Sequence, residues 1–192
     1  MAGLILASGS PRRKELLAML DMDFTVVVPE VDENIINAGT PGKKGELVAL
    51  AKARWAGDGH PGEVVLAADT MVVLDTGRIL GKPRDEKDAI HMLRALSGCS
   101  HNVITGVAIL RGQTEFETAF HVSTKVVFRD LTAGEIENYA ATGEPLDKAG
   151  AYGIQGKGSL LVEKIEGCYF NVVGLPLPRL AVKLKDFGIT LL

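Results

Sequence analysis

The first expected strand is followed by a small-residue turn, a proline and three cationic residues, Arg12, Arg13 and Lys14. A helix N-terminus carries partial positive charge, so each cation in its first turn is unfavourable by roughly 0.3–1 kcal/mol. A bound anion removes this penalty, because free backbone N–H groups and guanidinium forks both bind phosphate. The pattern favours a phosphate-binding turn that uses Arg12 and Arg13. Two solvated arginines are the alternative, and we interpret Lys14 as surface charge.

Two carboxylates lie close to the ends of other expected strands. Asp69 closes the apolar run 64–69, and Glu33 lies in the polar loop after the run 24–28. Ligands of open α/β sheets gather beyond the carboxyl ends of strands, and Mg²⁺ takes one or two carboxylates together with water and phosphate oxygens. The pair is therefore a candidate metal site. A turn-capping aspartate and a surface glutamate are the alternatives.

Two lysines complete the set of candidate residues. Lys52 lies inside an expected helix, and Lys82 lies in the segment "GKP" after an expected hairpin. Both are solvated amines by default, although an ammonium group also binds phosphate as a point charge. Cations and carboxylates distributed over several loops and element ends suit a polyphosphate ligand with a divalent ion.

The elements that must position these residues alternate between strand and helix patterns. Strands are expected at 4–7, 24–28, 64–69, 71–74, 78–80, 101–110 and 116–128, with two short strands after residue 158. Helices are expected at 11–20, 40–57, 84–98, 132–143 and 176–188. Asp69 is thus expected at a strand end, and Ser10 is expected to cap the first helix. The sum is one continuous mixed α/β domain over residues 1–192.

Composition excludes several classes of protein. The net charge of −3 and the aromatic content of 5% disfavour a nucleic-acid-binding module, which needs a basic stripe with stacking aromatics. No apolar run is long enough for a membrane span, and no signal peptide is apparent, so the cytoplasm is the expected location. Cys99 and Cys168 are too far apart in sequence for a CxxC metal motif, and we expect both to be reduced.

The common nucleotide and hydrolase motifs are absent. The chain has no GxxxxGK[ST] loop, no GxGxxG after a strand, no HExxH and no GxSxG. The four histidines, at positions 60, 91, 101 and 121, are not at ligand spacing and are interpreted as surface or structural residues. P-loop kinases and Rossmann dehydrogenases are therefore disfavoured.

Short motifs follow one another in order from residue 4 to about residue 180: "LASGSPRRKELL", "VDE", "AKA", "AADTMVV", "GKPRD", "MLRALSG", "HNVITGVA", "EPLDKAGAYGIQGKG" and "NVVGLPL". Together they resemble the motifs of the Maf-type nucleoside triphosphate pyrophosphatases. The resemblance implies the fold of inosine triphosphate pyrophosphatases: an elongated mixed sheet flanked by helices, with two lobes and a central cleft. A nucleoside triphosphate is then the expected partner, with a homodimer as one option and neither nucleic acid nor membrane.

The resemblance also implies a reaction and roles for particular residues. The reaction is hydrolysis between the α and β phosphates with a divalent cation, Mg²⁺ or Mn²⁺. Asp69 matches the proton acceptor, and Glu33 and Asp69 match the residues that hold the metal. The phosphate-facing positions of the family match Ser8, Arg12, Arg13, Lys52 and Lys82.

Three further positions indicate which subgroup of the family the chain resembles. The subgroup that prefers thymidine and uridine triphosphates has an arginine, a threonine and a glutamine at positions that match Arg12, Thr70 and Gln155. An amide both donates and accepts hydrogen bonds, so Gln155 suits the edge of a pyrimidine base. The sister subgroup, which acts on 7-methylguanosine triphosphate, is the second option. A non-catalytic nucleotide-binding regulator is the third, since the family is associated with arrest of cell division and septum formation.

Overall fold

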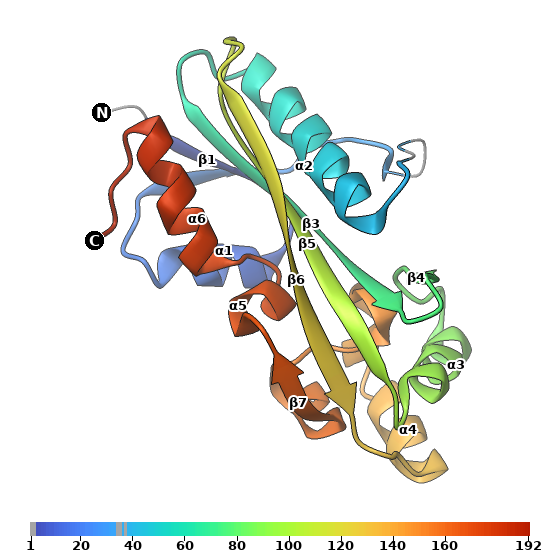
Figure 1. The fold of residues 1–192 in the computed structure, drawn as a ribbon. Helices are drawn as coiled ribbons and strands as arrows, with labels where there is room; N and C mark the ends of the chain where they lie inside the picture. Colours follow the sequence, from blue (N-terminus) through green and yellow to red (C-terminus); the bar gives the residue numbers. More distant parts are fainter. Residues whose placement is uncertain (1–2, 34–35, 37) are drawn as a thin grey trace. The chain divides into compact units, whose positions relative to one another are not determined.

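A mixed sheet of seven strands forms the framework of this computed structural model, which describes residues 3–33, 36 and 38–192 (Figure 1). The strands are β1 Leu4–Ala7, β2 Phe24–Val27, β3 Val64–Leu74, β4 Ile79–Leu80, β5 Ser100–Arg111, β6 Glu117–Phe128 and β7 Val162–Glu166. Their order is β2-β1-β3-β5-β6-β7, and β4 pairs with β3. The helices are α1 Pro11–Ala18, α2 Pro41–Asp58, α3 Glu86–Leu96, α4 Ala133–Ala140, α5 Tyr169–Val173 and α6 Leu177–Leu184. The expected mixed α/β class is confirmed.

The chain divides into two compact units. The first comprises the described residues of 1–69, 105–122 and 174–192, and the second comprises 70–104 and 123–173. The division falls within three strands, β3, β5 and β6, each of which contributes residues to both units. Ser8, Arg12, Arg13, Glu33, Lys52 and Asp69 therefore belong to the first unit, and Thr70, Lys82 and Gln155 belong to the second.

The first unit is built around β1, which pairs in parallel with both β2 and β3. All four residues of β1 are buried, as expected for a strand covered on both faces. Helix α2 packs on one face through Ala49, Ala53 and Ala56, which form a buried cluster with side chains of β1, β3 and β5. Figure 1 shows α2 on the opposite side of these strands from α1 and α6. The small alanines let α2 approach the sheet closely, which brings Lys52 of α2 within reach of β3.

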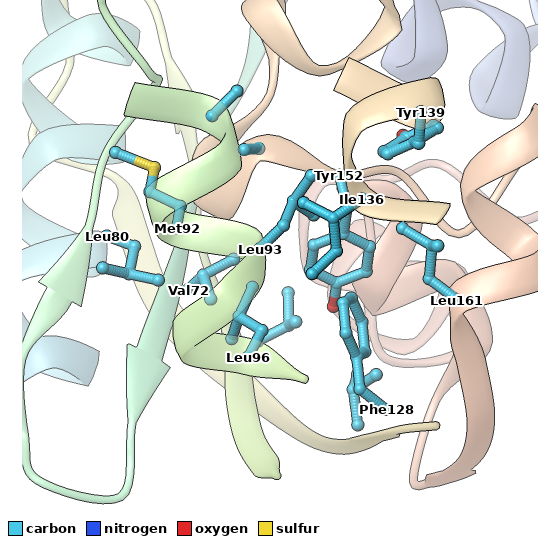
Figure 2. Packing of buried hydrophobic residues seen from close by; sticks show 14 residues of the cluster. Val72, Leu80, Met92, Leu93, Leu96, Phe128, Ile136, Tyr139, Tyr152 and Leu161 are labelled. Carbon is cyan, nitrogen blue, oxygen red and sulfur yellow. The ribbon is translucent and has the colours of Figure 1, made fainter. Parts of the chain in front are cut away.

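The second unit has its own hydrophobic core, drawn in Figure 2. Leu93 and Leu96 of α3, Ile136 of α4 and Tyr152 pack with Phe128 at the end of β6. Helix α4 begins with the capping box expected from its sequence, because the Thr132 hydroxyl accepts from the backbone of Glu135 and the Glu135 carboxylate accepts from the backbone of Thr132. The sequence pattern thus correctly places the start of this helix.

Two element predictions are wrong at their boundaries or in type. Strand β3 does not end at Asp69 but continues to Leu74, because the residues that follow, Thr-Met-Val-Val, are strand formers and are largely buried. The second short strand expected after residue 158 is instead the helix α5, which buries Asn171 and Val173. Asn171 donates from Nδ2 to the backbone oxygen of Val103 at 2.9 Å, and this buried contact belongs to the helical arrangement.

Other expectations about single residues agree with the structure. Cys99 and Cys168 are free thiols. His60 and His121 contact neighbouring groups near the surface, the backbone oxygen of Ala56 and the carboxylate of Glu46 respectively. In the described part of the chain, no helix is both long and apolar enough to cross a membrane.

His101 is fully buried in the core of the second unit. Its ring packs edge-on against Phe128 and Tyr152, and Nε2 lies 2.7 Å from the Tyr152 hydroxyl oxygen. Nδ1 has no hydrogen-bond partner among the described residues. Burial lowers the pKa of His101 from 6.5 to about 4. The folded protein therefore holds a neutral imidazole where the unfolded chain carries a cation at mildly acidic pH.

This burial predicts a loss of stability in acid. Between pH 6.5 and 4 the unfolded chain binds the proton and the folded chain does not, so the free energy of unfolding falls by about 3 kcal/mol on acidification to pH 4. Urea denaturation of the parent protein and of His101→Gln, each at pH 6.5 and at pH 4, measures this change in the free energy of unfolding. The variant should lose about 3 kcal/mol less than the parent. An identical pH dependence in both proteins would assign the acid sensitivity to other groups.

Candidate active site

The turn between β1 and α1 is organised by a serine hydroxyl. Ser10 has the extended backbone of a helix cap, but its side chain makes no capping hydrogen bond, contrary to the sequence-based expectation. Instead the buried Ser8 hydroxyl oxygen accepts from the Ser10 backbone N–H at 3.2 Å and from Arg13 Nη1 at 3.3 Å. Pro11 occupies the start of α1, and no acidic residue lies in the first turn. The first turn of α1 thus carries cations and no acidic side chain of its own.

Arg13 is fixed in this turn from a second direction. Its Nε donates to the backbone oxygen of Gly174 at 2.8 Å. Burial lowers the pKa of the Arg13 guanidinium, the nearby carboxylates of Asp69 and Glu33 raise it, and the neighbouring charge of Arg12 lowers it further. Arg13 thus interacts electrostatically with one cation, Arg12, and with two carboxylates, those of Asp69 and Glu33.

Gly174 is a contact that the sequence analysis did not identify. It lies 161 residues from Arg13, just before α6. No local spacing rule connects two such positions, and only the presence of Gly174 in the motif "NVVGLPL" marked the segment at all. The helix start is consequently completed by a segment from the far end of the chain.

Lys52 joins the two candidate carboxylates. Its Nζ lies 2.9 Å from Asp69 Oδ1 and 2.7 Å from Glu33 Oε1. Lys52 and Asp69 are each 9% exposed, whereas Glu33 is exposed. Lys52 reaches β3 because it lies on α2 between Ala49 and Ala53, whose small side chains pack on the sheet. The structure therefore brings Glu33, Lys52 and Asp69 together, as a shared site requires.

The donor set fits a divalent cation. A hard ion such as Mg²⁺ takes oxygen ligands and is held by one or two carboxylates plus water and phosphate oxygens. Glu33 and Asp69 supply two carboxylates that already contact one positive charge, the Lys52 ammonium. Among the described residues no group of three or more histidine, cysteine or acidic side chains has a metal-binding arrangement. An ion bound here would complete its coordination with other oxygens.

The remaining predicted site residues lie in the second unit. Thr70 follows Asp69 within β3, and Lys82 is exposed just after β4. Gln155 is exposed in the glycine-rich loop 150–158. The backbone N–H of Gly150, at the start of that loop, donates to the oxygen of Gly81 at 3.0 Å. The loop that carries Gln155 therefore begins beside the segment that carries Lys82.

The arrangement of strands and helices defines an α/β protein of a known fold. The structure superposes on a HAM1 protein from Coxiella burnetii with a TM-score of 0.51 and 16% identity, covering 97% of this chain and 100% of that chain. At this identity the likeness concerns the fold. Residues 3–187 match the family model described as Maf-like protein, and the chain belongs to the Maf family, as its motifs predicted.

Curated relatives match nearly the whole chain. Two relatives, from Symbiobacterium thermophilum and Moorella thermoacetica, are named dTTP/UTP pyrophosphatase. Each is 52% identical to this protein over 98% of this chain, and the match covers 95% of the first relative and 97% of the second. A third of the same name, from a Geobacillus species, is 50% identical over 98% of this chain and 100% of its own length.

Proposed function

We propose that this protein, with residues 1–192 acting as one catalytic domain, is a nucleoside triphosphate pyrophosphatase that hydrolyses dTTP and UTP to the monophosphate and pyrophosphate. The observation that carries the proposal is the contact of one buried ammonium, Lys52, with the carboxylates of Asp69 and Glu33. The names of relatives that are about half identical over 98% of this chain support the substrate class.

Asp69 is the proposed proton acceptor for the attacking water. A general base needs a carboxylate held in a fixed orientation within reach of the reacting proton. The Lys52 Nζ donates to Asp69 Oδ1 at 2.9 Å, and this hydrogen bond orients the carboxylate. Lys52 is thus proposed to orient Asp69 as well as to contact phosphate.

The helix start supplies the proposed phosphate contacts. Arg13, held by Ser8 and Gly174, presents a fixed guanidinium at the N-terminus of α1, and Arg12 adds a second cation in the same turn. Charge that develops on the phosphates is best stabilised by cations that need no rearrangement during the reaction. Lys82, which is exposed in the second unit, is also proposed as a phosphate-binding residue.

Glu33 and Asp69 are proposed to hold the divalent cation, Mg²⁺ or Mn²⁺. When bound, such an ion neutralises negative charge on phosphate oxygens. We expect EDTA to abolish pyrophosphate release from UTP and either ion to restore it. A colorimetric pyrophosphate assay with and without chelator checks this expectation. Full turnover in EDTA-treated, metal-free enzyme would remove the metal from the proposal.

Base preference is proposed to depend on Arg12, Thr70 and Gln155. The experiment that tests the function is a panel of dTTP, UTP, ATP, GTP and 7-methyl-GTP, assayed for pyrophosphate and for phosphate release. Preferred hydrolysis of dTTP and UTP supports the proposal, whereas preference for 7-methyl-GTP favours the sister activity. Tight nucleotide binding without turnover would identify a regulator instead. A homodimer and action in the cytoplasm stay predictions.

A further inference from the structure

The glycine-rich loop 150–158 is anchored by one carboxylate, that of Glu144. The backbone N–H of Lys157 donates to Glu144 Oε2 at 3.3 Å, and that of Gly158 donates to Oε1 at 3.2 Å. The hydroxyl of Tyr139 also donates to Oε1, at 2.9 Å. A carboxylate that accepts three hydrogen bonds, two of them from backbone, fixes the course of the loop after Gln155.

The loop can approach Glu144 this closely because it contains glycine at the contact points. Gly156 has a φ of +65°, and a Cβ there would lie 3.1 Å from Glu144 Oε2. A Cβ at Gly158 would lie 2.6 Å from the Tyr139 hydroxyl oxygen and 2.1 Å from the backbone oxygen of Gly153. Larger residues would therefore push the loop off its anchor.

The anchor is itself fixed to the core of the second unit. Tyr139 is 5% exposed, and burial raises its pKa, so its hydroxyl remains a donor. The backbone of Glu144 is held on both sides, because its N–H donates to the Thr142 hydroxyl at 3.2 Å and its oxygen accepts from Lys148 Nζ at 2.5 Å. The Glu144 carboxylate therefore connects the loop 150–158 to the buried Tyr139 of the core.

We propose that Glu144 is a positioning residue that sets base selectivity by fixing Gln155, an inference that rests on the proposed function. The chain is pinned on both sides of Gln155. Before it, the Gly153 N–H donates to the Tyr139 hydroxyl oxygen at 3.4 Å, and after it, Lys157 and Gly158 donate to Glu144. The Gln155 side chain is exposed at the centre of this pinned segment. An amide carried on a backbone held on both sides offers its donor and acceptor to a nucleotide base from a defined position.

Glu144→Gln tests the inference, because it replaces an acceptor oxygen with a donor while keeping the side-chain shape. Glu135→Gln is the matched control: Glu135 caps α4 in the same unit, and its carboxylate accepts from Thr132 and Arg129 instead of from the loop. Selectivity is measured as the ratio of dissociation constants for the α,β-methylene analogues of ATP and UTP. We expect this ratio to fall by about tenfold in Glu144→Gln and to stay within about twofold in the control.

Tyr139→Phe provides a second variant, since it keeps the buried ring and removes the hydroxyl that links Glu144 to Gly153. It should lower the ratio in the same direction, and amide hydrogen exchange across residues 153–158 should accelerate in both loop variants. An unchanged ratio in folded Glu144→Gln, or an equal fall in the Glu135 control, would overturn the inference. Selective binding of the UTP analogue without hydrolysis of UTP would overturn the proposed function. The role of Glu144 in base selectivity would then be decided by the ratio of dissociation constants alone.

Discussion

Asp69→Asn is expected to lower kcat for UTP hydrolysis by about 10²–10⁴-fold, the usual contribution of a general base. Asparagine keeps an oxygen that accepts from Lys52 Nζ, so the contact between α2 and β3 persists. What the variant loses is the carboxylate that takes the proton from water. The loss should therefore fall on kcat, with a smaller effect on the binding of a non-hydrolysable analogue.

Asp75→Asn is the matched control for this substitution. Asp75 follows the last residue of the same strand, β3, and accepts from the Ser100 hydroxyl at 3.0 Å on an exposed turn. Steady-state kinetics and urea unfolding of both variants separate chemistry from stability. Equal activity of Asp69→Asn and the parent would remove Asp69 from the chemical step.

Arg13→Glu is expected to weaken binding of the UTP analogue by about a hundredfold or more, because a fixed cation is replaced by an anion beside the triphosphate. Arg13→Gln should show most of the same loss, and it avoids placing a third carboxylate near Asp69 and Glu33. Lys14→Glu, one residue further along the same turn, should change binding by less than about threefold, since its side chain is exposed.

Calorimetric titration of the three variants with the α,β-methylene analogue of UTP measures these effects. The comparison is informative because both positions carry a cation in the first turn of α1, and a purely electrostatic helix effect would treat them alike. Similar losses for Arg13→Glu and Lys14→Glu would mean that general positive charge attracts the nucleotide, and that the hydrogen bonds of Arg13 to Ser8 and Gly174 do not matter.

Local rules predicted those parts of the fold that local chemistry determines. Pro11 starts α1, Thr40 caps α2 by accepting from the backbone of Lys43, and Thr132 opens α4, all as the sequence indicated. Each of these contacts spans only a few residues, so spacing alone reveals it. The same holds for the start of β3 at Val64, where a continuous apolar run begins.

Long-range packing determines the features that sequence reasoning missed. The Gly174 contact of Arg13 and the buried contact of Asn171 in α5 both depend on segments distant in the chain. Ser8, not Ser10, is the side-chain acceptor in the turn before α1, and its donor Arg13 also contacts Gly174 from the far end of the chain. Placement after neighbouring strands predicted a shared site for Glu33 and Asp69. The direct contact of Lys52 with both carboxylates was not predicted, because Lys52 lies inside a helix and no local spacing relates it to them.

The most direct test of the account is the identity of the products formed from UTP. We predict that ³¹P NMR of a reaction with Mg²⁺ detects UMP and pyrophosphate in equal amounts from the first turnover, with no UDP. That result requires cleavage between the α and β phosphates, the reaction proposed for Asp69 and the cations around it. Formation of UDP with inorganic phosphate would contradict the account.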